Sequence, residues 1–283
     1  MRPSAKVMRK DSAFIHAIIK MSPVSTHCAI AGTRPSTLYV TLDNWSAVAI
    51  MTRPRVLYEV WSLLLTISTV PSCPVGVETI YLETIDGVMI EADLVRTDAD
   101  HVRAVVIIGH PHPLYGGDRF NHVVRAMQEV ALRHDCHSVA VDFRGVNNSG
   151  GIHDNGDSER LDLAAACELA DLIAPEVPII MTGYSFGSVV GLNVSNPWIA
   201  GWIAVAPPAR MMTSQPAAAN SPGRKILITA EHDQFTTPEE LAIAISSWSN
   251  SEIILAKGVD HSFAVNIASH CDIALSQLLN TLS

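Results

Sequence analysis

The sequence predicts an α/β fold in which a mostly parallel sheet of eight strands carries helices on both faces. The chain has 283 residues, of which 48% are hydrophobic and 17% are charged, and this is enough apolar material for a sizeable core. From residue 76 onward, short runs rich in Val and Ile alternate with amphipathic stretches. Such runs are typical of strands buried on both faces of a parallel sheet. The Asp86-Gly87 pair between the first two runs indicates a tight hairpin turn.

The predicted elements follow one another in regular order. The opening hairpin is antiparallel, with strands expected at 77–84 and 88–95. Six further strands are expected at 104–109, 138–143, 177–182, 199–206, 225–230 and 252–256. Helices, identified by apolar residues at helical spacing, are expected at 121–134, 157–174, 187–195, 238–248 and 263–280.

Residues 1–75 differ in composition from the rest of the chain. They carry eight Lys or Arg and three Asp or Glu, a balance of +5, whereas residues 76–283 have a balance of −14. Only Gly32 of the 16 glycines lies before residue 76, although a packed α/β domain needs glycines at its turns. We therefore expect a poorly ordered N-terminal extension at 1–75 and a folded domain at 76–283.

The apolar run at 60–70 in this extension is too short to cross a bilayer. With arginines before the run and Cys73 after it, the segment 51–73 faintly resembles a secretory signal, but Glu59 and the fifty residues upstream argue against that function. We therefore expect a cytoplasmic protein. The net charge of −9 and the absence of a long basic run argue against binding to nucleic acid. The five widely spaced cysteines suggest neither a disulfide framework nor a zinc site.

The strongest chemical signal is the G-x-S-x-G pattern at 183–187, read as Gly-Tyr-Ser-Phe-Gly. It follows the strand expected at 177–182 and opens an apolar helix, which is the context that the pattern requires. The two glycines allow a turn so tight that a side chain at either position would clash, and the turn leaves the serine hydroxyl exposed. We therefore predict that Ser185 is a nucleophile.

A serine nucleophile needs a histidine base that is itself oriented by a carboxylate, and in this arrangement the chain order is Ser, acid, His. Three histidines follow Ser185. His261 lies just after the last strand, in a loop from which it can reach the serine. His270 falls inside the last predicted helix, and His232 has only its neighbour Glu231 before it as an orienting acid, so we predict that His261 is the base.

Asp233 is the predicted acid because it closely follows the strand expected at 225–230. Glu231 is the runner-up. The other carboxylates before His261 have ordinary roles: Glu239 and Glu240 open a helix, Glu252 starts a strand, and Asp260 is adjacent to His261, so its side chain is badly placed to face the imidazole.

We call the turn at 183–187, which carries Ser185, the elbow. Together with two other segments, the elbow resembles the α/β-hydrolase superfamily over 76–283, and more narrowly the small bacterial serine hydrolases with an H-P-H-P segment and no cap domain. The other segments are 109–117 (GHPHPLYGG) and 142–151 (DFRGVNNSGG). The resemblance implies that 76–283 is an α/β-hydrolase catalytic domain with a Ser-His-Asp triad acting on esters, thioesters or amides. Asn147 stands where family members often have Gly, a mild departure because Asn tolerates positive φ.

The H-P-H-P segment at 110–113 follows the third strand and is expected to supply half of an oxyanion hole. The main-chain N–H of Phe186, the residue after the nucleophile, is expected to supply the other half. Because proline has no N–H, His112 and Leu114 are the nearest donors, and His112 is favoured because it falls just beyond the position of an H-G pair in relatives. A metal site is disfavoured because no third ligand has suitable spacing.

Only 18 residues separate the sixth and seventh predicted strands, which is too few for a helical cap. We therefore expect an open site covered by loops at 114–121 and 207–223. Met211 and Met212 either line the site or pack on the sheet edge. Arg144 is expected to tie loops together near the site.

The sequence thus predicts a serine hydrolase that cleaves a carboxylic ester or thioester of a small molecule through an acyl-enzyme, with no cofactor and no metal. Two alternatives come from other classes. A cofactor-free peroxidase would use the same triad, and a non-catalytic binding protein would keep only the fold. The intact Ser, acid, His order argues against the binding protein. The oligomeric state is left open.

Overall fold

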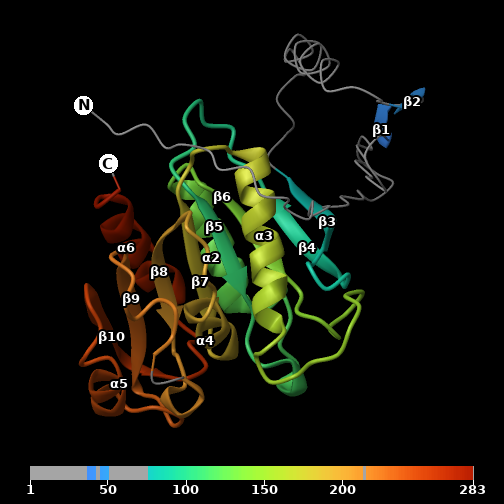
Figure 1. Ribbon diagram of the computed structural model, residues 1–283. Helices are drawn as coiled ribbons and strands as arrows, with labels where there is room; N and C mark the ends of the chain where they lie inside the picture. The colour runs from blue at the N-terminus through green and yellow to red at the C-terminus, as the bar shows by residue number, and fades with distance from the viewer. Residues whose placement is uncertain (1–36, 43–44, 51–75, 213–214, 283) are drawn as a thin grey trace.

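A computed structural model describes residues 37–42, 45–50, 76–212 and 215–282 (Figure 1). Its centre is an eight-stranded sheet with the order β10-β9-β8-β7-β5-β6-β4-β3. The strands are β3 (Val77–Glu83), β4 (Met89–Val95), β5 (Val105–Gly109), β6 (His137–Val141), β7 (Ile179–Tyr184), β8 (Ile199–Val205), β9 (Arg224–His232) and β10 (Ser251–Asp260). β4 alone runs antiparallel to its neighbours β3 and β6. The predicted sheet, mostly parallel with a hairpin at its start, is confirmed.

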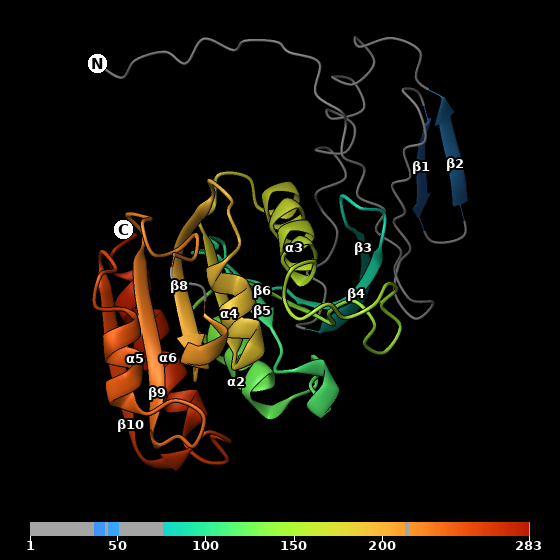
Figure 2. The same ribbon diagram turned by 60° about the horizontal axis from the view of Figure 1, so that its bottom comes forward.

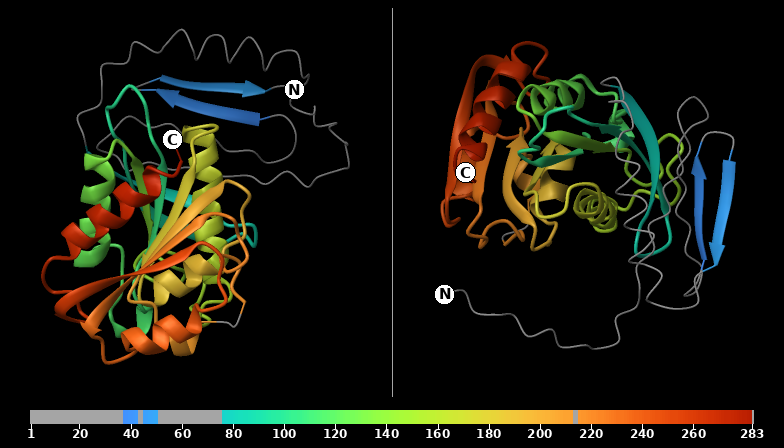
Figure 3. Two further views of the ribbon diagram at one scale, coloured as in Figure 1. Left: turned by 90° about the vertical axis from the view of Figure 1, so that its left-hand side faces the viewer. Right: turned by 90° about the horizontal axis from the view of Figure 1, so that it is seen from above.

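Helices cover both faces of this sheet, as the left panel of Figure 3 shows. The helices are α2 (His122–Arg133), α3 (Glu159–Ile173), α4 (Phe186–Leu192), α5 (Pro238–Ala244) and α6 (Ile267–Leu279). α2 and α6 pack on one face, and α3, α4 and α5 pack on the other. Alternate residues of β5 point into the two cores, with Ile107 in one and Ile108 in the other. The Val/Ile runs of the sequence are thus explained by burial on both sides.

The order of the strands determines where a site can form. β6 lies on one side of β5 and β7 lies on the other, so the chain changes direction across the sheet at β5. At such a switch point the loops after neighbouring strands diverge and leave a crevice at the carboxyl ends. Gly109 at the end of β5 pairs with Gly183 near the end of β7. Figure 2 brings the carboxyl ends of these strands forward, with α4 packed beside β5 and β8.

Two boundaries differ from the sequence prediction in ways that matter for the site. β10 continues to Asp260 instead of stopping at 256, because a register shift after Ala256 accommodates Gly258 at φ 69° and lets Asp260 pair with His232. α6 begins at Ile267 instead of 263, since positive φ at Phe263 interrupts a helical backbone. Both changes lengthen the irregular segment around residue 261.

No large cap domain covers the sheet. Between β8 and β9 the described residues form only one short helical turn, η2 (Ala209–Met211). None of the helices in the described part of the chain is long and apolar enough to cross a membrane.

The N-terminal part contains two strands that the sequence analysis did not predict. β1 (Thr37–Leu42) pairs antiparallel with β2 (Trp45–Ile50), and the pair forms a sheet separate from the eight-stranded one. The rest of the expected extension at 1–75, including the signal-like segment 51–73, lies outside the described residues.

Candidate active site

Ser185 lies at a sharp turn between β7 and α4. Its backbone has φ 51° and ψ −116°, a conformation that residues with side chains rarely adopt. A Cβ added to Gly183 would lie 2.4 Å from the main chain of Gly187, and one added to Gly187 would lie 2.4 Å from the main chain of Gly109. Both glycines of the G-x-S-x-G pattern are therefore required by the close approach of α4 to the strand ends, as the sequence predicts.

The structure brings Ser185, His261 and Asp233 into one hydrogen-bonded chain. Nε2 of His261 lies 3.0 Å from Oγ of Ser185, and Nδ1 of His261 lies 2.8 Å from Oδ2 of Asp233. These residues are 76 and 28 positions apart along the chain, and they come from the turns that follow β7, β9 and β10. The geometry required of a nucleophile, a base and an orienting acid is therefore present.

The hydrogen bonds of Asp233 determine which imidazole nitrogen carries the proton. Its other carboxylate oxygen, Oδ1, accepts the main-chain N–H groups of Phe235 at 2.8 Å and Thr236 at 3.1 Å, and its side chain is almost fully buried. An ionised carboxylate only accepts hydrogen bonds, so Nδ1 of His261 must donate to it. The lone pair of Nε2 then faces the Ser185 hydroxyl, which is the tautomer that a general base needs.

The other candidate acids and bases have different partners. Glu231, the runner-up acid, accepts the N–H of Gly258 at 2.7 Å and thereby supports the irregular part of β10. The carboxylate of Asp260 accepts the hydroxyl of Ser262. His270 contacts the carbonyl of Asn266 at the start of α6, and His232 is largely exposed. None of these side chains has a contact with Ser185 in the described structure.

Tyr184 supports His261, a role that the sequence analysis missed. Its hydroxyl donates a 2.7 Å hydrogen bond to the main-chain carbonyl of His261. Burial raises the pKa of Tyr184 to about 12, so the hydroxyl stays protonated and keeps donating. Its position beside the nucleophile in the elbow was the available signal, but nothing in the sequence shows that it reaches a loop 77 residues away.

The two histidines of the H-P-H-P segment have different environments. His110 is fully buried, with Nε2 accepting the N–H of Phe143 at 3.0 Å and Nδ1 lying 2.6 Å from the carbonyl of Pro111. Burial lowers the pKa of His110 to about 3, so its ring is neutral. Because both ring nitrogens are already bonded to the main chain, His110 is unsuited to bind a metal. In the described part of the chain, no three His, Cys, Asp or Glu side chains are grouped as metal ligands.

The main-chain N–H groups of His112 and Phe186 donate to no other group within the described residues. By contrast, the N–H of Leu114, the alternative donor, lies 3.3 Å from Nδ1 of His112 and donates to it. The N–H groups of Tyr115 and Gly117 both donate to the carbonyl of His112. Between residues 112 and 117, His112 is therefore the position whose N–H is left for a ligand.

A cavity of about 290 Å³ opens at Ser185. Its lining includes His112, Phe186 and His261 together with the aromatic rings of Tyr115 and Phe235, and no Lys, Arg, Asp or Glu of the described chain takes part. Of the two methionines considered from the sequence, Met211 lines the cavity and Met212 packs against the core. An uncharged, aromatic-lined cavity favours an uncharged organic group.

A buried ion cluster anchors the loop that carries this cavity, and the sequence analysis missed it. Arg119 bonds Glu91 at 2.8 Å, Asp93 at 3.0 Å and also Asp142, and its main-chain N–H donates to Asp142 at 2.7 Å. All four side chains are almost fully buried. The loop between β5 and α2 is thus tied to β4 and to the end of β6. Nothing in the local sequence distinguishes Arg119 from a solvated loop arginine.

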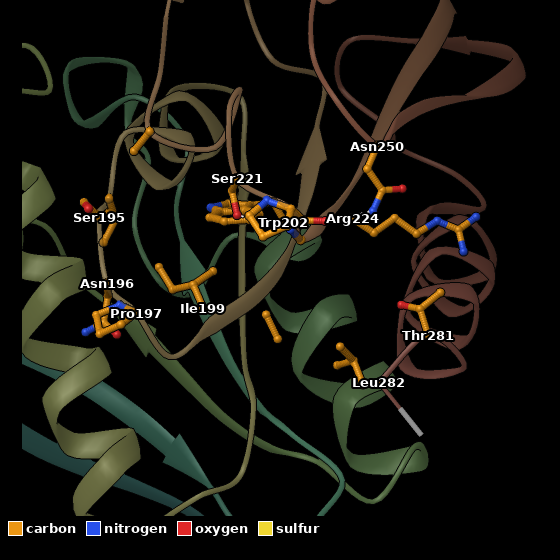
Figure 4. A pocket seen from close by; sticks show the side chains of 15 residues that line it. Ser195, Asn196, Pro197, Ile199, Trp202, Ser221, Arg224, Asn250, Thr281 and Leu282 are labelled. Atoms are coloured by element: carbon orange, nitrogen blue, oxygen red, sulfur yellow. Dashed lines mark hydrogen bonds between the residues drawn. The ribbon is translucent and has the colours of Figure 1, made fainter. Parts of the chain in front are cut away.

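A larger cavity of about 550 Å³ lies at the amino ends of β8 and β9, at the opposite end of the strands from Ser185 (Figure 4). In the close-up, Arg224 and Asn250 lie on one side of it and Asn196 lies on the other. Two of its polar side chains are already engaged, since Arg224 pairs with Glu252 at 2.7 Å and Asn250 donates to the carbonyl of Pro222. Its lining holds no serine with a histidine partner, so we place the candidate active site at Ser185.

Comparisons with known proteins agree with this fold. A model of the alpha/beta hydrolase family matches residues 105–271. An uncharacterized protein of Rickettsia prowazekii is 25% identical over 170 residues, which cover 56% of this chain and 71% of that protein. An alpha-beta serine hydrolase homologue from Coxiella burnetii has a TM-score of 0.61 at 25% identity, covering 72% of this chain and 97% of the other.

A serine hydrolase without a lid from Xanthomonas campestris has a TM-score of 0.65 at 23% identity, covering 75% of this chain and 97% of the other. Its fold agrees with the missing cap between β8 and β9. Because the family model spans more than half of the sequence, and includes both the elbow and His261, this chain belongs to the alpha/beta hydrolase family.

Proposed function

We propose that this protein is a serine hydrolase that cleaves carboxylic esters or thioesters of small molecules through an acyl-enzyme. The observation that carries the proposal is the chain of contacts from Ser185 to His261 to Asp233, with the imidazole lone pair facing the serine hydroxyl. The strained serine backbone supports it, because such strain is concentrated at catalytic nucleophiles.

The reaction has two halves. Oγ of Ser185 attacks the substrate carbonyl carbon while Nε2 of His261 takes the hydroxyl proton, and Asp233 stabilises the imidazolium that results. The carbon–oxygen or carbon–sulfur bond breaks, and the imidazolium returns the proton to the leaving alcohol or thiol. Water then attacks the acyl-enzyme by the same route, which releases the acid and restores Ser185. No metal or cofactor takes part.

In each half the carbonyl oxygen becomes negatively charged, and donors placed in advance must stabilise it. We assign these donors to the main-chain N–H groups of Phe186 and His112. Both residues line the cavity at Ser185, and neither N–H has another partner in the described structure. The same lining contains no Lys, Arg, Asp or Glu side chain, which favours uncharged acyl groups. Esters and thioesters are favoured over amides because their leaving groups are better.

The test is turnover of p-nitrophenyl esters of graded acyl length by the full chain and by S185A. We expect S185A to lose activity on the order of 10⁶-fold, because the triad acts as a unit, and to lose covalent labelling by a fluorophosphonate as well. A matched control is S262A, since Ser262 is adjacent to His261 but its hydroxyl bonds Asp260 at 2.6 Å. That variant should keep turnover close to wild type.

Three results would contradict the proposal. An S185A variant with most of the wild-type activity would mean that another residue is the nucleophile. A wild-type chain with neither ester turnover nor labelling would favour the non-catalytic binding protein. Oxidation of halide by hydrogen peroxide in the presence of a carboxylic acid, at rates above ester hydrolysis, would favour the peroxidase.

A further inference from the structure

A second histidine–carboxylate pair lies close to the candidate active site but outside the triad. Nδ1 of His153 is 2.5 Å from Oε1 of Glu159, and the two side chains are 10% and 0% exposed. Glu159 also accepts the main-chain N–H groups of Asp154 at 3.1 Å and Gly156 at 2.8 Å. A fully buried carboxylate therefore organises the segment from residue 153 to the first turn of α3, and the imidazole of His153 is held against it.

The ring of His153 packs against both residues to which the oxyanion hole is assigned. Its centroid is 5.0 Å from that of His112 and 5.3 Å from that of Phe186, and the last two rings are 4.9 Å apart. His112 comes from the loop after β5 and Phe186 from the elbow after β7. Among the described residues, His153 is the one ring that contacts both of them.

An apolar ring would fill this space without leaving a polar atom buried. Nε2 of His153 is buried and has no hydrogen-bond partner in the described structure, which costs free energy. The contact between Nδ1 and Glu159 is close but not aligned as a hydrogen bond. This close approach limits where the ring can lie. The imidazole thus provides something that packing alone would not, namely a fixed ring position relative to Glu159.

We propose that His153, tethered by Glu159, is a positioning residue that holds the main-chain N–H groups of His112 and Phe186 at the spacing that an oxyanion requires. This inference rests on the proposed hydrolase function. The two N–H groups come from different segments, so their separation depends on what packs between and behind their side chains. Such donors act on the charge of the transition state more than on the bound substrate. Loss of His153 should therefore lower kcat and leave KM nearly unchanged.

The experiment compares H153A, H153F and H134A in the full chain, with p-nitrophenyl butyrate as substrate. H134A is the matched control, because His134 also faces a carboxylate, Asp272 at 3.1 Å, but lies at the far end of α2. We expect H153A to lower kcat by about 10- to 100-fold with KM changed less than about threefold, since a small misplacement of catalytic groups costs up to that much. H153F keeps a ring but loses the tether and should fall between H153A and wild type.

A second readout is inhibition by an alkyl trifluoromethyl ketone, whose adduct with Ser185 carries an oxyanion. We expect its inhibition constant to rise in H153A by about the same factor as kcat falls, and not to rise in H134A. Wild-type kcat in either His153 variant, or a loss confined to KM, would overturn the inference while leaving the hydrolase proposal intact. A wild-type chain inactive on every ester would instead remove the proposed function, and this inference with it.

Discussion

His110 and His112 are separated by one proline and have the same side chain, but they have different roles. His110 is sealed in the interior and bonds the main chain through both ring nitrogens, so it shapes the start of the loop. His112 lines the cavity and leaves its N–H without a partner in the described chain. The proposed role of His112 as an oxyanion donor belongs to its main-chain N–H. Its imidazole contributes packing and a weak hydrogen bond from the N–H of Leu114.

This difference gives a prediction at residue scale. The φ of His112 is −55°, which lies within the range of proline, so H112P should remove the N–H with little strain on the backbone. We expect H112P to lower kcat by about 10²- to 10³-fold, the usual loss for one oxyanion donor, and H112A to lose much less because it keeps the N–H.

Steady-state kinetics on one ester, with melting temperatures for both variants, would measure this. Equal losses in H112P and H112A would show that the imidazole matters and the N–H does not. Leu114 would become the candidate donor if H112P kept its activity.

At the scale of elements, Arg144 joins parts of the fold that are not neighbours in sequence. Its guanidinium bonds Asp86 in the β3–β4 turn at 2.9 Å and Asp162 on α3 at 2.8 Å. Its main-chain N–H also donates to Asp162 at 2.9 Å. The bonds from Arg144 hold the pKa of Asp86 below its usual value. The expectation that Arg144 ties loops together is confirmed by these contacts.

Removing this guanidinium should destabilise the folded protein, because Asp162 is fully buried and would lose its counter-charge. We expect R144M to lower the free energy of unfolding by about 3–5 kcal/mol. The matched control is R160M, since Arg160 pairs with the exposed Asp157 at 3.5 Å and such surface pairs contribute about 1 kcal/mol or less. Urea denaturation of both variants would measure the difference. A loss in R144M no larger than that in R160M would refute this account of the tie.

At the scale of the whole molecule, the charge and glycine patterns divide the chain at about residue 75. Among the residues whose strands and burial the structure describes, the eight-stranded sheet and both of its cores are built from residues after this point. The described strands before it, β1 and β2, pair only with each other. We therefore keep the proposal that 1–75 is an extension and that 76–283 folds and acts alone.

A chain that begins at Val75 should fold and keep the kcat and KM of the full chain, because no strand of the main sheet is removed. Melting temperature by circular dichroism and ester kinetics on the two chains would check this. A melting temperature lower by more than about 5 °C, which corresponds to roughly 1–2 kcal/mol in a domain of this size, would show that the extension packs on the core.

Much of this architecture can be predicted from short stretches of sequence. The Val/Ile runs predict the inner strands β5 to β9, because a strand buried on both faces must be apolar throughout, and each of the expected helices is present. The elbow at Ser185 is partly local: a Cβ on Gly183 would clash with Gly187 within the same turn, whereas a Cβ on Gly187 would clash with Gly109 at the end of β5. The predicted C-terminal end of β10 and N-terminal end of α6 were wrong. The hydrophobic pattern does not indicate the pairing between Asp260 and His232 or the positive φ at Phe263.

The sequence by itself determined the fold class, the elbow and a short choice of partners for Ser185. Only the tertiary structure decided which carboxylate meets His261, because Glu231 at the end of β9 and Asp233 just after it are two residues apart, and Glu231 accepts the N–H of Gly258 instead. The contacts of His153 with His112 and Phe186 could not be predicted from the sequence either. The physical reason is the same in both cases. Hydrogen bonds and ring contacts between distant segments depend on strand order and side-chain direction, which arise only when the sheet has assembled.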